Sequence, residues 1–321
     1  LAHALFDSQT RWPVSERMPA DFNWKAAMEL GKNPGLGVRA LHQRGITGRG
    51  VALGIVDLPL LTQHQEYRDR IKYYEEIGVA PAEAARIHGP AVASLAVGQT
   101  VGVAPEASLY YIALGDTPRR TLIKNHCYAL GVRRLLEVNR RLPAPEKIRA
   151  ISLSAGWSRG SFGYDEIQAA IREAEAAGIF VIDNGEGAGE FRISGLTRAA
   201  LADPEAFESY EPWSRYRWNG RLLDRSPGQL FVPLEARTAA SPTGADEYAF
   251  FGEGVASWTP PYLGGMYALA AQARPGLTPQ AFRALALKTG RTGQTEQAGR
   301  KIPFRPILDP AALLKAVSRG N

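Results

Sequence analysis

The sequence predicts an α/β fold in which helices cover both faces of a mostly parallel sheet. Short apolar runs of strand length alternate with segments of helical periodicity along most of the chain. The apolar runs show little polar alternation, which is typical of strands buried on both faces. With 321 residues and 45% hydrophobic content, the chain is long enough to bury a large core.

The first of these units lies near the N-terminal end of the chain. Residues 37–45 are predicted to form a short helix that ends at a glycine, and residues 51–57 a buried strand that ends at Asp57. A carboxylate at the carboxyl end of a central strand lies where α/β sheets place their functional sites. The glycines at 45, 48 and 50 precede this strand, whereas a dinucleotide loop follows its strand. We therefore do not expect a dinucleotide site.

The alternation continues to the end of the chain. Residues 88–98 are predicted to be a helix that begins at His88. Residues 184–230, rich in Gly, Pro, Arg and aromatic residues, are expected to be long surface loops. The other predicted strands are 108–114, 149–154, 179–183, 230–234 and 247–251, and the other predicted helices are 121–141, 165–177, 278–287 and 309–317.

The domain organisation predicted is an N-terminal arm followed by one domain. Residues 1–36 mix Pro, Trp and charged residues without a clear period, and we expect them to lie as an arm over the domain formed by residues 37–321. No internal repeat or linker divides the chain further. The chain begins without a charged segment followed by an apolar one, so a signal peptide is not visible, although a removed signal or pro-segment is compatible with this.

Composition argues against several classes of function. The formal charge of +6, from 38 basic and 32 acidic residues, is spread along the chain without an arginine–aromatic array, so we expect no nucleic-acid partner. No run of 18 apolar residues exists, which argues against a membrane span. Cys127 is the only cysteine, so no intrachain disulfide can form. We expect it to pack in its apolar-flanked helix rather than act as a nucleophile.

The segment from Gly254 to Pro275 is the most informative in the chain. Apolar residues recur with helical spacing from Leu263 onward, and two prolines at 260–261 suit the first turn, where their missing N–H groups have no helical partner. This places Ser257 at a helix start, where N–H groups and the helix dipole favour developing negative charge. The glycines at 264–265 cost about 1 kcal/mol each in a helix, which suggests a buried helix packed closely against another backbone.

An isolated serine before a helix is most often only an N-cap. Here, however, Asp57 at a strand end and His88 at a helix start fit the same chemistry as Ser257. The chain order Asp…His…Ser on a parallel α/β sheet resembles that of the subtilisin-like serine peptidases. The resemblance implies a subtilisin-like three-layer fold. It also implies a triad in which Ser257 attacks a carbonyl, His88 transfers the proton and Asp57 orients the histidine.

Further segments extend this resemblance over residues 37–317. The His88-Gly-x-x-Val-Ala segment is similar to the family's His-Gly-Thr-His-Val-Ala, and Ser154-Ala155-Gly156 to its Ser-Leu-Gly substrate edge. Ser257-x-x-x-Pro261-x-x-x-Gly265 keeps the spacing around the nucleophile. A match shifted by one residue, with Ala256 as the nucleophile, loses the register of Gly265, Leu269 and Pro275. Similar matches surround the first strand (41–51) and follow the histidine helix (102–110).

Several positions depart from the family pattern, and two of them leave alternatives open. The oxyanion asparagine of the family aligns without gaps to Gly185, and Asn184 lies one residue earlier, so a one-residue shift of this glycine-rich turn would be needed to restore Asn184. His64 is a rival to His88 as the base, because it is close to Asp57 in sequence. The remaining histidines, His3, His42 and His126, have ordinary surface or core interpretations.

From the residues and the resemblance together we expect a serine endopeptidase that acts on a polypeptide through an acyl-enzyme. The substrate would pair with Ser154, Ala155 and Gly156 as an added strand. The alternative is a subtilisin-fold binding or regulatory protein with weak or no turnover, caused by the altered oxyanion turn. No cofactor is expected. Calcium is common in the family, but no Asp-x-Asp-x-Asp-Gly loop is present, so no metal site is assigned. A secreted or cell-envelope location is favoured, and a pro-segment or inhibitor is a possible partner.

Overall fold

A five-stranded parallel sheet forms the centre of the structure, which is a computed structural model that describes residues 4–80, 84–115, 120–185, 191–213, 228–297 and 299–319. The strand order is β3-β4-β2-β5-β6, and every neighbouring pair is parallel. All six residues of the central strand β2 are buried. The strands are β2 (Ala52–Asp57), β3 (Ile71–Ile77), β4 (Ser108–Leu114), β5 (Ile148–Ser152) and β6 (Phe180–Ile182).

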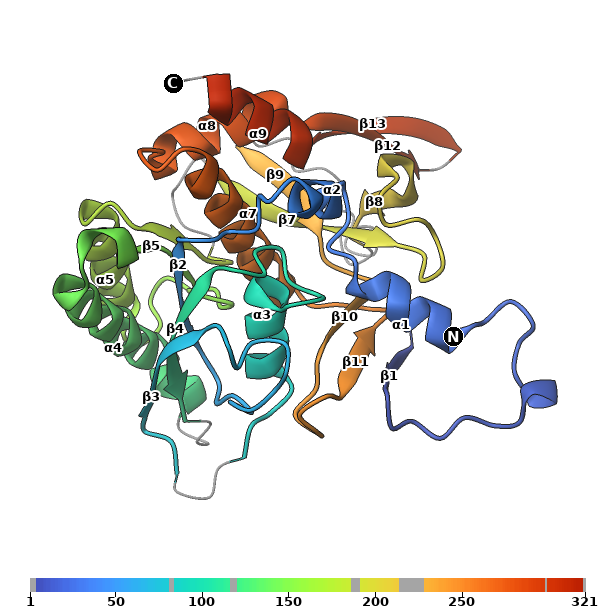
Figure 1. The fold of residues 1–321 in the computed structure, drawn as a ribbon, viewed down its shortest axis with the longest axis horizontal. Coiled ribbons are helices and arrows are strands. Elements are labelled where there is room, and N and C mark those ends of the chain that lie inside the picture. Colours follow the sequence, from blue (N-terminus) through green and yellow to red (C-terminus); the bar gives the residue numbers. More distant parts are fainter. Residues whose placement is uncertain are drawn as a thin grey trace.

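Helices cover both faces of this sheet, so the predicted three-layer fold is confirmed (Figure 1). One face carries α3 (His88–Val97) and α7 (Thr259–Ala273), and the other carries α4 (Arg120–Arg141) and α5 (Tyr164–Ala176). Each face has its own hydrophobic cluster, and Cys127 packs against the one beneath α4 and α5, as expected. Within the described ranges, no helix is both long and apolar enough to cross a membrane. The other helices among the described residues are α1 (Trp24–Lys32), α2 (Val38–Gln43), α8 (Pro279–Thr289) and α9 (Pro310–Arg319).

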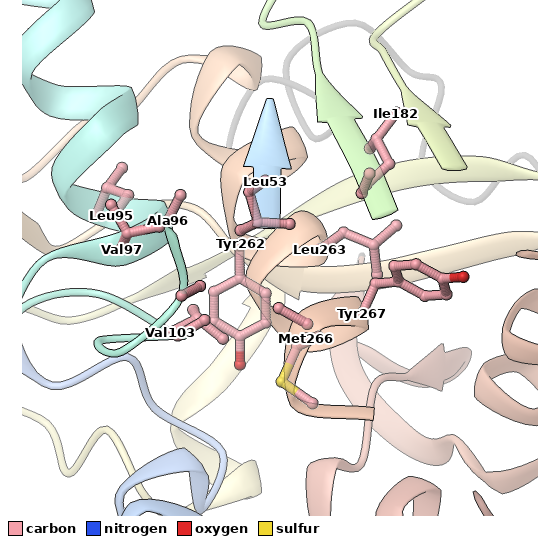
Figure 2. Close-up of a cluster of buried hydrophobic side chains, with 14 of the residues drawn as sticks. Leu53, Leu95, Ala96, Val97, Val103, Ile182, Tyr262, Leu263, Met266 and Tyr267 are labelled. Atoms are coloured by element: carbon pink, nitrogen blue, oxygen red, sulfur yellow. The ribbon is translucent and has the colours of Figure 1, made fainter. Parts of the chain in front are cut away.

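Helix α7 is buried over almost its whole length. Every residue from Thr259 to Ala271 is buried, and its side chains pack between α3 and the sheet (Figure 2). Its two prolines occupy the first turn, as expected. A Cβ added to Gly265 would lie 2.5 Å from Val103 Cβ and 3.3 Å from the carbonyl oxygen of Ala96. Gly265 is therefore required by the close approach of α3 and the segment after it, as the sequence predicts, whereas Gly264 has ordinary space around it.

Two further sheets flank the parallel one. The larger has the order β12-β13-β9-β7-β8, and the smaller has the order β1-β11-β10. The larger comprises β7 (Arg192–Arg198), β8 (Tyr210–Pro212), β9 (Gln229–Pro233), β12 (Arg291–Gln297) and β13 (Arg300–Ile307). The smaller comprises β1 (Leu5–Asp7), β10 (Arg237–Ala240) and β11 (Tyr248–Phe251). Short 3-10 turns complete the structure at 15–17, 144–146, 207–209 and 256–258.

The expectation that residues 184–230 form surface loops is wrong for the part that the structure describes, because β7 and β8 lie within it. Their polar composition hides the strands. Arg198 is 5% exposed, yet its guanidinium donates to the carbonyl oxygens of Ala199, Ala200, Ala202 and Ala236. Burial lowers the pKa of Arg198. A cradle of carbonyl groups that only the folded chain assembles therefore makes an arginine acceptable inside a sheet.

The segment predicted as an N-terminal arm contacts the small sheet. Strand β1 pairs with β11, and α1, which the sequence did not reveal, packs on β10. The side-chain oxygen of Asn23 accepts a hydrogen bond from Ala26 N–H and so caps α1. A Cβ on Gly31 would lie 2.5 Å from Thr238 Oγ1, so this helix lies directly on the strand. The boundary between an arm and a domain at residue 37 stays a prediction.

The two adjacent glycines of α7 give opposite predictions for stability. Gly265→Ala places a methyl group against Val103 and should lower the free energy of unfolding by about 1–3 kcal/mol, as overpacking does in well-packed cores. Gly264→Ala has its nearest neighbours at 3.7 and 3.9 Å and should be neutral or raise it by up to about 1 kcal/mol, because alanine favours helix. Equilibrium urea unfolding of the two variants measures this. Equal stabilities would contradict the account of the α3–α7 contact.

Candidate active site

Asp57 and His88 form a hydrogen-bonded pair at the carboxyl end of β2. The Nδ1 atom of His88 lies 2.6 Å from Asp57 Oδ1, and the same oxygen accepts the N–H of Leu58 at 2.7 Å. The side chain of Asp57 is fully buried, whereas that of His88 is 27% exposed. With Asp57 as the acceptor of this hydrogen bond, Nδ1 is the donor and Nε2 is the ring nitrogen that can take up a proton.

A glycine allows this pair to form. Gly89 follows His88 at the start of α3, and a Cβ there would lie 2.3 Å from the carbonyl oxygen of Leu58 and 2.8 Å from that of Pro59. Any larger residue would push the helix start away from the chain that leaves β2. The dipeptide His88-Gly89 therefore has a geometric reason: the histidine reaches Asp57 only because its neighbour lacks a side chain.

Ser257 lies in the 3-10 turn that leads into α7. The N-cap of the α-helix itself is Trp258, which makes no side-chain capping bond, so Ser257 is not an ordinary N-cap. The Trp258 ring lies 5.5 Å from the His88 ring and 5.0 Å from that of Phe251. Through Trp258, the start of α7 therefore meets the start of α3, which brings the three predicted catalytic segments to one edge of the sheet.

The Ser257 hydroxyl faces the chain that leaves β5. Its Oγ is 3.4 Å from the carbonyl oxygen of Ser154, a long contact for a hydroxyl, and the Ser154 hydroxyl donates to the carbonyl oxygen of Ser257 at 2.7 Å. The hydroxyl of Ser257 is therefore held only weakly. The two serines nevertheless fix the helix start against the predicted substrate edge.

The chain makes a tight turn at Ser154, where the N–H of Ala155 donates to the carbonyl oxygen of Leu153 at 2.7 Å, and the carbonyl groups that follow face different partners. The Ala155 carbonyl accepts the N–H of Asn184 at 2.9 Å, on the side of β6. The Ser154 carbonyl faces Ser257, and the Gly156 carbonyl accepts Lys124 Nζ at 3.2 Å. Ala155 itself is 5% exposed and packs in the core with Trp157. Ser154 and Gly156 are thus the residues of this edge whose carbonyl groups point away from β6.

Asn184 lies directly after β6 and Asp183. Its Oδ1 is 3.2 Å from Thr259 Oγ1, whose hydroxyl also lies 2.8 Å from the carbonyl oxygen of Ala256. The Asn184 side chain is therefore beside the start of α7. Gly185 instead lies under the indole of Trp157, where a Cβ would be 2.7 Å from Trp157 Cδ1. Of the two alternatives that the sequence leaves open, Asn184 is the one directed at the Ser257 turn. Glu186 and Gly187 lie outside the described residues.

His64, the alternative to His88 as the base, is held by main-chain groups away from Asp57. His64 is fully buried, its Nε2 lies 2.8 Å from the carbonyl oxygen of Glu247, and its Nδ1 accepts the N–H of Glu66. Both ring nitrogens are thus engaged by main-chain groups rather than by Asp57. Burial lowers the pKa of His42, which contacts the Val103 carbonyl oxygen, and His126 contacts Glu166. His3 lies outside the described residues.

Three residues at this edge were not singled out from the sequence: Trp157, Asp183 and Thr259. Trp157 Nε1 donates to Asp183 Oδ2 at 2.7 Å, and Thr259 contacts Asn184 as described. The only sequence signal was a carboxylate that directly follows a buried strand. As for a metal, the described part of the chain contains no group of three or more His, Cys, Asp or Glu side chains arranged to hold an ion.

Comparison with known proteins gives a family match over the first part of the chain. Residues 48–206 match the model of the subtilase family, a span that includes Asp57, His88 and Asn184 and ends before Ser257. The subtilisin-like protease PopC of Myxococcus xanthus (strain DK1622) is 31% identical over 134 residues, which cover 38% of this chain and 28% of that protein. The chain thus spans about a quarter of that relative's length.

Two solved structures share the fold. The prenylagaramide maturation protease PagA superposes with a TM-score of 0.60 and 14% identity over 88% of this chain and 98% of that one. The PatG macrocyclase, solved in complex with a peptide, superposes with a TM-score of 0.60 and 13% identity over 88% and 95%. At these identities the likeness concerns the fold alone. The match of residues 48–206 to the family model and the 31% identity to PopC confirm the resemblance to the subtilase family that the sequence shows.

Proposed function

We propose that this protein is a serine endopeptidase in which Ser257 is the nucleophile, His88 the general base and Asp57 the residue that orients the histidine. The observation that carries the proposal is the Asp57–His88 pair. A fully buried carboxylate 2.6 Å from Nδ1 fixes the tautomer in which Nε2 is the ring nitrogen that takes up a proton. The match of residues 48–206 to the subtilase family model supports the same assignment.

The reaction follows from these roles. Ser257 Oγ forms a bond to the carbonyl carbon of the substrate while its proton moves to Nε2 of His88. That proton then passes to the leaving amine as the C–N bond breaks, and an acyl-enzyme remains. Water repeats the sequence on the acyl-enzyme, with His88 again taking the proton. Asp57 orients the ring and stabilises the imidazolium that forms.

The negative charge that develops on the carbonyl oxygen needs donors. The backbone N–H of Ser257 and the side chain of Asn184 are assigned this role, and two observations support it. Asn184 lies beside Thr259 at the start of α7, and the positive end of a buried helix points at the same place. The helix dipole and the amide then act on the same atom.

The substrate proposed is a polypeptide that adds a strand to residues 154–156. The carbonyl groups of Ser154 and Gly156 point away from β6, so they are disposed to accept main-chain N–H groups of an extended peptide. Recognition would thus depend largely on the main chain. The Gly156 carbonyl is already contacted by Lys124 Nζ, which leaves its second lone pair for the substrate.

The second candidate function is that of a binding or regulatory protein with weak turnover. This hypothesis assumes that the turn after β6 provides no asparagine side chain as an oxyanion donor. The proximity of Asn184 to the α7 start favours the enzyme over this alternative. An acyl-enzyme can be resolved by water or by an amine, and the structures of similar fold are those of a maturation protease and a macrocyclase. Product analysis by mass therefore has to look for hydrolysed and ligated peptides alike.

Ser257 should be the only residue that a serine-directed fluorophosphonate labels. Intact mass spectrometry should show one added equivalent on the wild type and on Cys127→Ala, and none on Ser257→Ala. The reason is that the probe requires a hydroxyl activated by a neighbouring base. Labelling that persists in Ser257→Ala, or that moves to Cys127, would contradict the assignment of the nucleophile.

N-methylation of the substrate main chain tests the added strand. Methylating an amide that pairs with Ser154 or Gly156 should lower kcat/KM about two- to tenfold, the effect of one net hydrogen bond of roughly 0.5–1.5 kcal/mol. Methylation of the intervening amides, which point away from the edge, is the matched control. Peptides whose kcat/KM falls equally at both sets of positions would argue against strand addition.

Asn184 should act on turnover rather than on binding. Loss of one oxyanion donor costs about a hundred- to thousandfold in rate in enzymes of this class, so Asn184→Ala should lower kcat by about that factor with little change in KM. Asn33→Ala, which removes a hydrogen-bonded asparagine outside the site, is the control. A fast wild-type enzyme that is indifferent to Asn184→Ala would mean that another residue supplies the donor.

A further inference from the structure

The carboxylate of Asp183 connects the two segments that carry the proposed site. Its Oδ2 accepts the indole N–H of Trp157 at 2.7 Å, and its Oδ1 accepts the backbone N–H of Gly185 at 2.9 Å. Trp157 directly follows the substrate edge, and Gly185 directly follows Asn184. One side chain therefore bridges the end of the edge to the turn that presents the oxyanion donor.

Packing reinforces this bridge. Trp157 is 5% exposed, and its ring covers Gly185 so closely that a Cβ there would lie 2.7 Å from Cδ1. On the neighbouring side, a Cβ on Gly156 would lie 2.9 Å from the carbonyl oxygen of Asn184. Lys124 Nζ lies 5.5 Å from the centroid of the Trp157 ring. The indole is thus fixed in place, and the turn is in contact with it.

The backbone of Asn184 is consequently held on both sides. Its own N–H donates to the carbonyl oxygen of Ala155 at 2.9 Å, and the next N–H, that of Gly185, donates to Asp183. Between these two bonds the Asn184 side chain is directed at Thr259. A donor must reach within about 2.7–3.1 Å of the oxyanion, so a turn held on one side only would lose alignment.

The chemistry of position 183 explains why a carboxylate is present there. Two N–H donors converge on the side chain, and an ionised carboxylate is acceptor-only, whereas asparagine offers a single acceptor oxygen. Burial raises the pKa of Asp183, and the hydrogen bonds from Trp157 and Gly185 oppose this effect. The distant charges act in opposite directions, since Glu175 raises the pKa and Arg283 lowers it. The net effect is a raised pKa, because burial is the largest of these contributions.

We propose that Asp183 is a positioning residue, which holds the Asn184 turn in register with the substrate edge through Trp157. This inference rests on the proposed function, because the turn matters for turnover only if Asn184 stabilises an oxyanion. It assigns a role to the position at which this chain departs from the family pattern. The asparagine one residue earlier than expected is held in place by the carboxylate before it and the tryptophan across from it.

The experiment compares Asp183→Asn with wild type in two independent measurements. The first is the rate of phosphonate labelling at Ser257 together with kcat and KM on a peptide. Asp183→Asn should lower the labelling rate and kcat about ten- to a hundredfold, the effect of a misplaced group, and leave KM within about twofold. The second is amide hydrogen exchange, which should become faster at Asn184 and Gly185.

Matched variants separate positioning from general damage to the fold. Trp157→Phe keeps an aromatic side chain but removes the indole N–H and the five-membered ring that covers Gly185, so it should also lower kcat. Asp309→Asn makes the same substitution at a buried carboxylate that also accepts two donors, from Arg291 and Ala312, and it should leave kcat unchanged. In an Asn184→Ala background, Asp183→Asn should cost little more, because its effect passes through Asn184.

The outcomes distinguish this inference from the proposed function. If wild type labels and Asp183→Asn labels equally fast, or if its loss adds fully to that of Asn184→Ala, the inference is overturned while the enzyme assignment stands. If wild type does not label, the proposed function fails, and hydrogen exchange still decides the bridge. Unchanged exchange at Asn184 and Gly185 in Asp183→Asn would overturn the bridge whatever the activity.

Discussion

The close contact between α3 and α7 is the constraint on which the site depends. Gly265 lets α7 lie very close to Val103, in the segment that follows α3. A Cβ at position 265 would be only 2.5 Å from the Cβ of Val103. That approach sets the start of one helix beside the start of the other, so that Trp258 meets His88. Because protein interiors are close-packed, a shift of this contact by a fraction of an ångström would be transmitted to both helix starts. The hydrophobic core around α7 is thus part of the machinery that places Ser257.

The carboxyl edge of the parallel sheet positions the other residues of the proposed site. Asp57 is the last residue of β2, and Ser154 and Asn184 follow the ends of β5 and β6 in the same sheet. In an open α/β sheet such positions converge because all strands point the same way. Chain segments more than a hundred residues apart therefore meet without any special device. What is particular to this chain is the way the last of them is held, by a carboxylate and an indole.

The sequence correctly predicted those elements whose local composition matches the burial that they have in the folded structure. Buried strands such as β2 are apolar throughout, and the glycine and proline positions of α7 have direct geometric reasons in the structure. It did not predict β7, where a buried arginine relies on carbonyl groups from two segments, or α1, whose buried face lies on a strand more than 200 residues later. In these places tertiary contacts outweigh local composition, which is why periodicity and propensity did not reveal them.

The proposed site likewise has features that could be predicted from the sequence and features that only tertiary contacts determine. The order of Asp57, His88 and Ser257, and their places at a strand end and at helix starts, follow from local patterns and could be read from the sequence alone. The sequence left two choices open, His64 or His88 as the base and Asn184 or Gly185 at the turn. Tertiary contacts favour one member of each, because main-chain groups occupy both nitrogens of His64 and the Trp157 ring covers Gly185. Hydrogen-bond partners and steric exclusion join residues distant in sequence, so only the folded chain determines them.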